Sequence, residues 1–475
     1  MGTILMGQAA YKRLDHPEMR LRNMMFERTP ANVRDQVSLV QCAGLSAFCD
    51  VGAADVDLIY RQAGTLDGLV VVISNQNIYS FDPTDASQVG TAAALGIVGR
   101  PVLASGGSGI VYFAGAGLTA DNKFIGDVLK TATIDDGTAS IIVSNVTFPD
   151  AANVADLTYI NGYFIFVRGE SQAFYWLNPG ETVIDGLDYA SAETSPDGLV
   201  ASRRLGDELV NFGQENIEPW YPTGDGDFPF ARIQGRSYAY GLANRNTVVE
   251  LDGALLFVGS DRIVYRYQGQ PTRISDHFIE EQLKGVDFTA ISAWCYGDQG
   301  HLHYALTIEG KGTFCFDLST QTWWERSSHL NSEFKGRTSC ALGDGRWLVA
   351  GETAGAVYVL DAAANDDAGA PLERIFTGLV EVDARTVCAS VGLDCTVGAG
   401  PTLADDPQIA LRWSDDDCKT WSDWQFKPLG RLGEYQTNVV WRRLGQISKR
   451  RVFQWRVTDP VNFTVRRAWM NEGVR

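Results

Sequence analysis

The chain has 475 residues, of which 45% are hydrophobic, 11% aromatic and 21% charged, and it contains 49 Gly. This composition is typical of a folded protein that favours β-structure, and the length suffices for two or three domains, or for one large repeat domain with an appendage. The formal net charge of −18 excludes a Lys- and Arg-rich DNA-binding surface that dominates the molecule, although a local basic patch is compatible with it.

The eight cysteines are scattered without the close pairs of a metal site, and no N-terminal segment resembles a secretion signal. We therefore expect reduced, mostly buried thiols in a protein made in a cytoplasm. The longest apolar runs, such as GLVVVI and GALLFVG, have the length of strands and fall short of the ~20 residues that cross a bilayer. The sequence predicts no membrane segment.

Residues 1–51 precede the repeats described next and do not share their pattern. They include the charged stretch YKRLDHPEMRLRNMMFERTPANVRDQ. We expect an N-terminal arm or extension that packs on a neighbouring subunit or on the repeat domain.

Residues 52–361 repeat one pattern seven times: a Gly or Asp-Gly turn, an alternating apolar strand, a second turn and an aromatic-rich strand. Examples are DGLVVVISNQNIYSF from Asp67, DGALLFVGSDRIVYRY from Asp252 and DGRWLVAGETAGAVYVL from Asp344. The units recur roughly every 45 residues, as four-stranded propeller blades do when they bury their faces against one another. The pattern predicts an all-β fold with a β-propeller of six or seven blades. A long pair of β-sandwiches is the alternative.

The repeats stop near Asp361. The stretch AAANDDAGAP (362–371) is small, polar and rich in Gly and Pro, so it reads as a linker. Alternating stretches such as QIALRWS and RVFQWRVTD follow, and they predict a C-terminal β-sandwich over residues 372–475.

Residues 414–421, SDDDCKTW, look like an Asp box, S-x-D-x-G-x-T-W, with Cys in place of the usual Gly. In such a hairpin Asp416 accepts backbone hydrogen bonds, the hydroxyls of Ser414 and Thr420 support it, and Trp421 packs under the turn. Asp boxes are best known from sialidases, which also need an arginine cluster, a Tyr nucleophile with a Glu partner and several boxes. This chain has one box, outside the repeats, and no nucleophile motif. We expect a structural hairpin, no catalytic residues and no enzyme.

Two acidic turns and one histidine pair are candidate metal ligands. Asp415–Asp417 and Gly224–Asp227 cluster carboxylates, but neither has the spacing of a calcium loop. His301 and His303 alternate along a predicted strand, as a zinc pair would, without a third ligand near in sequence. Metal-free surface turns and sheet-face histidines are the preferred interpretation. We therefore expect no metal and no cofactor.

The C-terminal end is basic. Residues 431–475 contain ten basic and three acidic residues, a local balance of +7, which leaves −25 for the first 430 residues. Arginine interleaved with Trp and Val suits either a nucleic-acid surface or a protein interface, and we favour the protein interface. The candidate residues of this basic patch are Arg442, Arg443, Lys449, Arg450, Arg451, Arg466 and Arg467.

Several long stretches together resemble one family. They are SPDGLVASRRLGDELVNFGQENIEPWYPTGDGDFPFARIQG, NTVVELDGALLFVGSDRIVYRYQGQPTRISDHFIE, TFCFDLSTQTWWERSS and LRWSDDDCKTWSDWQFKPLGRLGEYQTNVVWRRLGQISKRRVFQWRVTDP. The chain is similar to the packaged-DNA stabilisation proteins of short-tailed bacteriophages, also called tail accessory, hub or nozzle proteins. The similarity runs from about Ser195 to the C-terminus, whereas residues 1–190 match mainly in layout.

This resemblance implies a structural protein of the virion tail, made in the host bacterial cytoplasm. Family members form a ring, typically of six copies, below the portal and its adaptor ring. The ring extends the DNA channel, helps to retain packaged double-stranded DNA before ejection and anchors tail needle, tailspike or fibre proteins. DNA would pass without sequence-specific binding. We expect acidic propeller loops to line the channel and the basic sandwich to face an adaptor or a neighbouring subunit. A glycan-binding or glycan-hydrolysing tail propeller is the alternative, and a cellular propeller scaffold is a further one.

Overall fold

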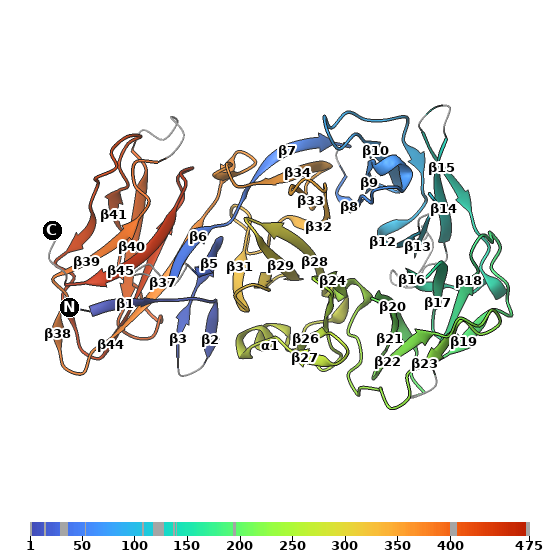
Figure 1. Cartoon of the computed structure of the whole chain (residues 1–475). Helices are drawn as coiled ribbons and strands as arrows, with labels where there is room; N and C mark the ends of the chain where they lie inside the picture. Colours follow the sequence, from blue (N-terminus) through green and yellow to red (C-terminus); the bar gives the residue numbers. More distant parts are fainter. Residues whose placement is uncertain are drawn as a thin grey trace.

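The computed structural model describes residues 2–13, 16–28, 37–52, 54–106, 109–116, 128–135, 138, 140–192, 196–399 and 406–471. Strands dominate these ranges, and Figure 1 shows a ring of sheets beside a second, layered β-domain that holds both chain ends. The all-β prediction is confirmed. The helices described are α1 (His277–Leu283) and four short 3-10 helices (Leu66–Gly68, Pro149–Ala151, Arg245–Thr247 and Phe288–Ala290). None of them has the length and hydropathy of a membrane span.

The ring is a β-propeller built from four-stranded antiparallel sheets. The first two blades are β8 (Val56–Tyr60), β9 (Val70–Ser74), β10 (Asn77–Phe81), β11 (Ala93–Ala94), and β12 (Val98–Ser105), β13 (Val111–Ala116), β14 (Val128–Asp135), β15 (Ser140–Asn145). The next two are β16 (Val154–Ile160), β17 (Tyr163–Arg168), β18 (Ala173–Leu177), β19 (Tyr189–Ser191), and β20 (Leu199–Leu205), β21 (Glu208–Gly213), β22 (Ile217–Pro222), β23 (Phe230–Arg232).

The fifth blade is β24 (Val249–Leu251), β25 (Ala254–Val258), β26 (Val264–Tyr267) and β27 (Pro271–Arg273). The sixth is β28 (Ile291–Asp298), β29 (His301–Ile308), β30 (Gly312–Asp317) and β31 (Thr322–Arg326). The last contains β32 (Gly336–Ala341), β33 (Trp347–Gly351), β34 (Ala356–Asp361) and β7 (Gly44–Asp50). The described residues thus form seven four-stranded units, within the predicted range of six or seven.

Each repeat predicted from the sequence falls on the second and third strands of one blade. The tight turns between the first and second strands of these blades use residues that tolerate positive φ. Asp252 and Gly253 have φ of 51° and 65°, and Asn161 and Gly162 have 49° and 94°. Two successive positive φ values match the twist of a β-hairpin, which explains why Asn-Gly and Asp-Gly mark these positions.

The ring is closed by a strand from the N-terminal segment. β7 pairs antiparallel with β34, from Gly44 opposite Asp361 to Asp50 opposite Ala356. The first blade then packs on this last one through β8 against β32 and β33. One blade therefore combines strands from the two ends of the propeller sequence, so opening the ring would require breaking a complete strand ladder.

The second domain is a β-sandwich of two antiparallel layers. One layer orders β41 (Gln425–Pro428), β40 (Gln408–Ser414), β44 (Arg450–Val457) and β37 (Arg374–Glu381). The other orders β42 (Val439–Arg442), β39 (Ser390–Cys395), β45 (Thr464–Met470), β6 (Val37–Gln41) and β5 (Met24–Arg28). Short strands β38 (Thr386–Val387) and β43 (Gln446–Ile447) pair at one end.

N-terminal strands also join the two domains. β1 (Gly2–Met6) pairs with β45 over its first half and with β37 over its second, so it links both layers of the sandwich. β4 (Leu21–Arg22) pairs parallel with β31 of the propeller and antiparallel with β37 of the sandwich. The hairpin of β2 (Tyr11–Arg13) and β3 (His16–Met19) lies between them. Residues within 1–51, expected to form an arm, thus supply strands to both domains.

Residues 362–371, expected to form a linker, contain β35 (Asp366–Asp367) and β36 (Ala370–Pro371). β35 pairs with the closing strand β7. This segment therefore continues the sheet of the last blade up to the start of the sandwich.

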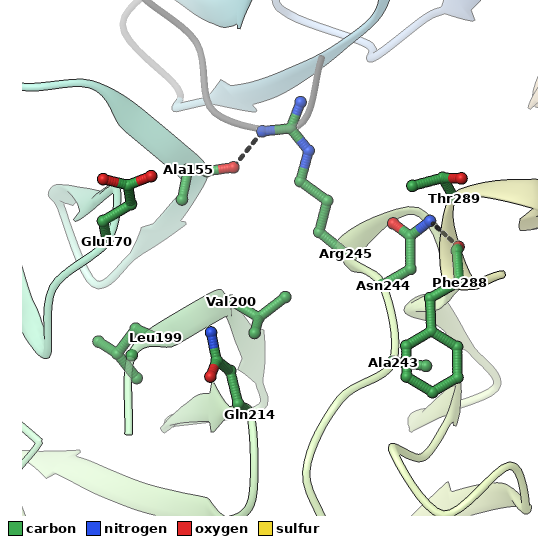
Figure 2. Close-up of a pocket in the computed structure, with 11 residues that line it drawn as sticks. Ala155, Glu170, Leu199, Val200, Gln214, Ala243, Asn244, Arg245, Phe288 and Thr289 are labelled. Carbon is green, nitrogen blue, oxygen red and sulfur yellow. Dashed lines mark hydrogen bonds between the residues drawn. The ribbon is translucent and has the colours of Figure 1, made fainter. Parts of the chain in front are cut away.

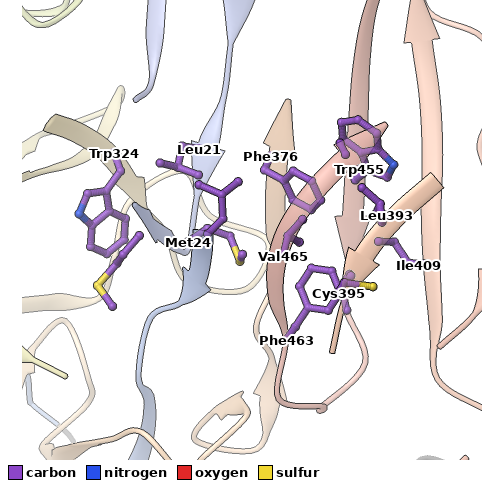
Figure 3. Packing of buried hydrophobic residues seen from close by; sticks show 14 of the residues in the cluster. Leu21, Met24, Trp324, Phe376, Leu393, Cys395, Ile409, Trp455, Phe463 and Val465 are labelled. Atoms are coloured by element: carbon purple, nitrogen blue, oxygen red, sulfur yellow. The ribbon is translucent and has the colours of Figure 1, made fainter. Parts of the chain in front are cut away.

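The largest buried cluster crosses the boundary between the domains (Figure 3). It runs from Trp324 of the propeller through Leu21 and Met24 to Phe376 and Trp455 of the sandwich, all at most 2% exposed. The last two rings stack with centroids 5.0 Å apart. Burying a large apolar side chain contributes about 1.5–3 kcal/mol. A shared core of this kind stabilises the two domains as one body.

Candidate interaction surface

The Asp-box-like hairpin lies in the sandwich between β40 and β41. Asp416 accepts hydrogen bonds from the Ser414 hydroxyl at 2.8 Å, from the Thr420 backbone N–H at 2.8 Å and from the Thr420 hydroxyl at 2.6 Å. The Ser414 hydroxyl in turn accepts the Cys418 N–H at 3.0 Å. The bonds from Thr420 above all lower the pKa of Asp416 to about 2, because they favour its charged form. These side chains hold a turn.

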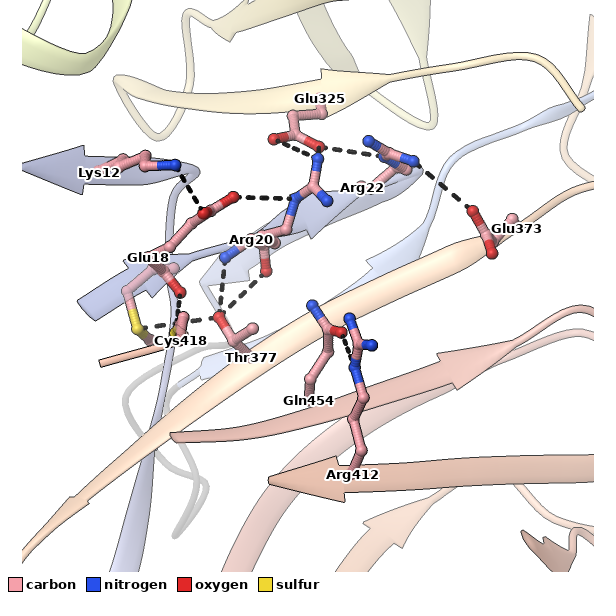
Figure 4. Close-up of polar contacts among 11 residues, drawn as sticks. Lys12, Glu18, Arg20, Arg22, Glu325, Glu373, Thr377, Arg412, Cys418 and Gln454 are labelled. Atoms are coloured by element: carbon pink, nitrogen blue, oxygen red, sulfur yellow. Dashed lines mark hydrogen bonds and ion pairs between the residues drawn. The ribbon is translucent and has the colours of Figure 1, made fainter. Parts of the chain in front are cut away.

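Cys418 occupies the position where an Asp box usually has Gly. It has a φ of 68°, and Asp417 before it has 60°, so both are in the left-handed region. The Cys418 thiol lies 3.6 Å from the backbone oxygen of Glu18 in β3, as Figure 4 shows. The side chain that strains this turn therefore also contacts the N-terminal hairpin.

Trp421 belongs to a stack that sequence reasoning missed. The Arg412 guanidinium lies over the Trp421 ring at 4.4 Å and over the Trp424 ring at 4.5 Å from the centroids. Arg456 lies over Trp424 at 4.5 Å, and Arg412 donates to the Gln454 amide oxygen at 2.7 Å. Each such cation–π contact contributes about 0.5–1 kcal/mol at an exposed site. The sequence signal for this stack was the repeated Trp of WSDW together with two arginines, Arg412 and Arg456, in strands that pair.

Arginines pair with the acidic residues on both sides of Asp416. Arg451, which is 3% exposed, donates from Nε and Nη2 to both carboxylate oxygens of Asp415, at 2.7 and 2.8 Å. Arg450 forms an ion pair with Asp417. Within the described residues no group of three or more His, Cys, Asp or Glu is placed to hold a metal ion. The carboxylates of this turn therefore serve the hairpin and its neighbouring strand β44.

The predicted basic patch divides into paired and exposed members. Arg450 and Arg451 bind the acidic turn, and Arg466 donates to Asp394 at 3.1 Å. Arg467 is half-buried. Arg466 is also exposed, whereas three further exposed members have no ion pair among the described residues and lie around the end of β42 and the turns that follow it: Arg442, Arg443 and Lys449. We call Arg442, Arg443 and Lys449 the exposed basic triad, and these three are the members free of a described ion pair for contact with a partner.

The domain junction holds an ion-pair network that sequence reasoning also missed (Figure 4). Glu325 of β31 accepts from Arg20 Nη2 and from Arg22 Nε, each at 3.1 Å. Arg22 further lies 3.6 Å from Glu373, and the backbone N–H of Arg20 donates to the Thr377 hydroxyl at 2.9 Å. The N-terminal strands thus bind the propeller with one side and the sandwich with the other. No motif predicts these pairs, because their members lie about 300 residues apart in sequence.

The two histidines have opposite environments. His301 contacts Asp317 through Nδ1 and Glu27 through Nε2, each at 2.6 Å. The hydrogen bond that the charged imidazole donates to Asp317, and then the one it donates to Glu27, raise the pKa of His301 to about 9. His303 is fully buried, and burial lowers its pKa to about 3. His301 therefore binds N-terminal β5 to the propeller as a charged group, and His303 is a neutral core residue.

A cavity of about 220 Å³ opens between the third, fourth and fifth blades (Figure 2). Among the described residues of its lining one carries a carboxylate, Glu170, whereas glycoside hydrolysis normally uses two facing carboxyl groups. Asn244 donates to the backbone oxygen of Phe288 at 2.8 Å, and Arg245 extends toward Ala155. The polar groups here mainly connect neighbouring blades.

Both domains match models of known protein families. A family model described as bacteriophage P22 Gp10, beta-propeller, matches residues 3–365, and a second, bacteriophage P22 Gp10, beta-sandwich, matches residues 373–472. No individual curated protein matches the chain.

Solved structures with similarity include several propellers. The WD40 propeller domain of Doa1 shares 10% identity and a TM-score of 0.40, over 67% of this chain and 96% of that one. The β-propeller domain of Myceliophteria thermophila Cps50 (Swd1) shares 10% identity and a TM-score of 0.43, over 66% of this chain and 98% of that one. Raptor of Chaetomium thermophilum shares 10% identity and a TM-score of 0.44, over 67% of this chain and 29% of that one. At these TM-scores the similarity supports no conclusion about this chain.

The two family models follow each other in the order propeller then sandwich, and together they match nearly all of the chain. The described sheets have the same order. The chain therefore belongs to the bacteriophage P22 Gp10 family of structural phage tail proteins.

Proposed function

We propose that this protein is a ring-forming hub, or nozzle, of a short-tailed phage. Copies of the chain would assemble below the portal and its adaptor ring and extend the channel through which DNA leaves. The ring would help to retain the packaged double-stranded DNA and would anchor tail needle, tailspike or fibre proteins. The observation that carries this proposal is the match of both domains, in order, to the Gp10 family.

The connection between the domains supports a mechanical role in the tail. The propeller and the sandwich share a buried core, and β4 continues the sheet from one to the other. Interfaces between domains are otherwise small and permit relative motion. A protein that withstands the pressure of packaged DNA benefits from subunits that do not flex at this point.

Charge supports an oriented assembly. The body of the chain is acidic, and the exposed basic triad lies on the sandwich. An acidic channel wall would repel DNA phosphates and let the genome slide, whereas the triad would contact an acidic surface of an adaptor or neighbouring subunit.

The direct test is native mass spectrometry and cryo-EM of the purified chain with its portal and adaptor. We expect a closed ring bound coaxially to the adaptor, with the sandwich at that contact. A chain that remains monomeric and does not bind the portal–adaptor complex would exclude the hub role, while leaving the family membership untouched.

A variant pair tests the orientation. Arg442→Glu, Arg443→Glu and Lys449→Glu together should weaken adaptor binding at least tenfold, because three attractive contacts become repulsive. The matched control reverses three exposed basic residues of the propeller, Lys284, Lys311 and Arg346. If the control variant loses as much affinity as the triad variant, the sandwich is not the adaptor-facing surface.

A further inference from the structure

Three hollows follow one another along the inner strands of the propeller. The first, drawn in Figure 2, reaches the start of β16 and β20, and the third reaches their far ends. The middle hollow shares Arg245 with the first and Arg203 with the third. The middle hollow is lined by the first strands of four blades, β8, β12, β16 and β20, and by the 3-10 helix before the fifth blade, which places it in the central tunnel expected of a propeller. The middle hollow, of about 210 Å³, is the part that concerns us.

The lining of this middle cavity is positively charged. It includes Arg100 from β12, Arg203 from β20 and Arg245 from the 3-10 helix before β24, and no Asp or Glu is among the described residues that line it. Among the described residues, the carboxylate that forms an ion pair with one of these arginines is that of Asp156, which is fully buried and pairs with Arg203. Three guanidinium groups against one carboxylate leave an excess of positive charge, in a chain whose net charge is −18.

Two nitrogens of the Arg245 guanidinium group have no acceptor among the residues that the structure describes. Its side chain is 2% exposed, and one terminal nitrogen donates to the backbone oxygen of Ala155, as Figure 2 shows. Its Nε and its other terminal nitrogen have no hydrogen-bond partner among the described residues. Buried N–H groups are rarely left without an acceptor, because the lost hydration is not replaced. An acceptor in the cavity would complete this side chain.

Burial and mutual repulsion both lower the pKa values of Arg100 and Arg245. Burial first, and the neighbouring Arg203 second, lower the pKa of Arg100 to about 10. Burial likewise lowers the pKa of Arg245 to about 10. Both groups remain charged at neutral pH, so their repulsion persists. Arg100 donates to the backbone oxygen of Ala293 at 3.1 Å, which orders it without offsetting its charge.

We propose that the middle cavity of the propeller tunnel binds a small tetrahedral oxyanion of the phosphate class, held by Arg100, Arg203 and Arg245. The guanidinium fork binds oxyanions through two parallel N–H bonds. The three forks come from the second, fourth and fifth blades, and so they approach from different directions. That arrangement suits the four oxygens of phosphate better than the single plane of a carboxylate. A bound anion would link three blades across the tunnel.

The test uses the purified full-length chain and inorganic phosphate as the probe. Isothermal titration should show saturable binding at millimolar concentration, and the thermal midpoint should rise with phosphate at constant ionic strength relative to chloride. Arg245→Gln and Arg203→Gln should each reduce phosphate affinity at least tenfold. Arg204→Gln, next along β20 and outside the middle cavity, should leave it unchanged.

Each outcome is decisive. Wild-type protein that shows no saturable phosphate binding overturns the proposal, as does an equal response in wild type and Arg245→Gln, since phosphate salts stabilise most proteins non-specifically. Circular dichroism verifies that the variants fold. If they do not fold, the phosphate titration of the wild-type protein decides the proposal by itself. A short single-stranded oligonucleotide distinguishes the source of the phosphate: binding of the oligonucleotide in place of inorganic phosphate would overturn a small-ion site.

Discussion

The guanidinium Nε of Arg22 lies 3.1 Å from a carboxylate oxygen of Glu325, and the same two residues are Cα partners in the pairing of β4 with β31. Arg22 is also a Cα partner of Ile375 in the sandwich. One residue near the N-terminus therefore connects the two domains by backbone and side chain together. This explains why the domains share one continuous core in place of a flexible hinge.

Replacing Glu325 by Ala should destabilise the junction. The change leaves Arg20 and Arg22, 30% and 15% exposed, without their common acceptor. Breaking a buried ion pair costs about 3–5 kcal/mol, and we expect about 2–3 here because Arg20 is partly solvated. Urea unfolding measures the loss, and limited proteolysis should cut between the domains. Glu281→Ala, which breaks an exposed pair with Lys284, should cost at most about 1 kcal/mol. Equal losses in both variants would contradict the role of the junction.

His301 should make the protein less stable in mild alkali. Its pKa is raised from an ordinary 6.5 to about 9, so its stabilising charge is fully present below pH 6.5 and is lost as the pH rises through 9. We expect a loss of roughly 1–3 kcal/mol over that interval. Urea midpoints from pH 6 to 9.5 measure it. Since buried thiols also lower stability above pH 9, the comparison is with His301→Gln, whose midpoints should vary less. Parallel curves for the two proteins would refute the assignment.

Asp416→Ala should loosen the Asp-box-like hairpin. The variant loses three hydrogen bonds that the carboxylate accepts from Ser414 and Thr420. Since the pKa of Asp416 is lowered to about 2, its contribution is present above pH 4 and is lost only as the pH falls toward 2. Hydrogen exchange at the Cys418 and Thr420 amides should rise strongly at pH 7. Asp423→Ala, an exposed neighbour, serves as control, and unchanged exchange in Asp416→Ala would show that the turn forms without the carboxylate.

Cys418→Gly should be tolerated or slightly stabilising. The left-handed backbone conformation costs a non-glycine residue of order 1–2 kcal/mol, and glycine removes that cost. Two losses oppose this gain, because glycine makes the unfolded chain more flexible and removes the thiol contact with Glu18. We expect a net gain below about 1 kcal/mol in urea unfolding. Cys418→Val should be destabilising, since a β-branched side chain fits positive φ poorly. A clear loss in Cys418→Gly would mean that the thiol contact outweighs the backbone strain.

Local signals in the sequence predicted local structure well. The seven hairpin repeats, including those at Asp67, Asp252 and Asp344, each correspond to the middle of one blade, since Asn-Gly and Asp-Gly turns and alternating strands act over short distances. The residues of the predicted basic patch differ in their contacts, and local signals do not indicate which of them are paired. The exposed basic triad is accessible, but Arg450 and Arg451 are bound by Asp417 and Asp415, which no spacing rule could indicate.

By itself the sequence determined the all-β class, the propeller followed by a sandwich and the resemblance to a phage tail family, because repeats, strand periodicity and long shared stretches are properties of the chain in order. Only the tertiary structure decided that residues near the N-terminus close the ring and join the domains, and that Arg100, Arg203 and Arg245 meet in one tunnel. Those relationships depend on contacts between residues tens to hundreds of positions apart. Such contacts form only when every blade is in place, since each blade buries its faces against its neighbours.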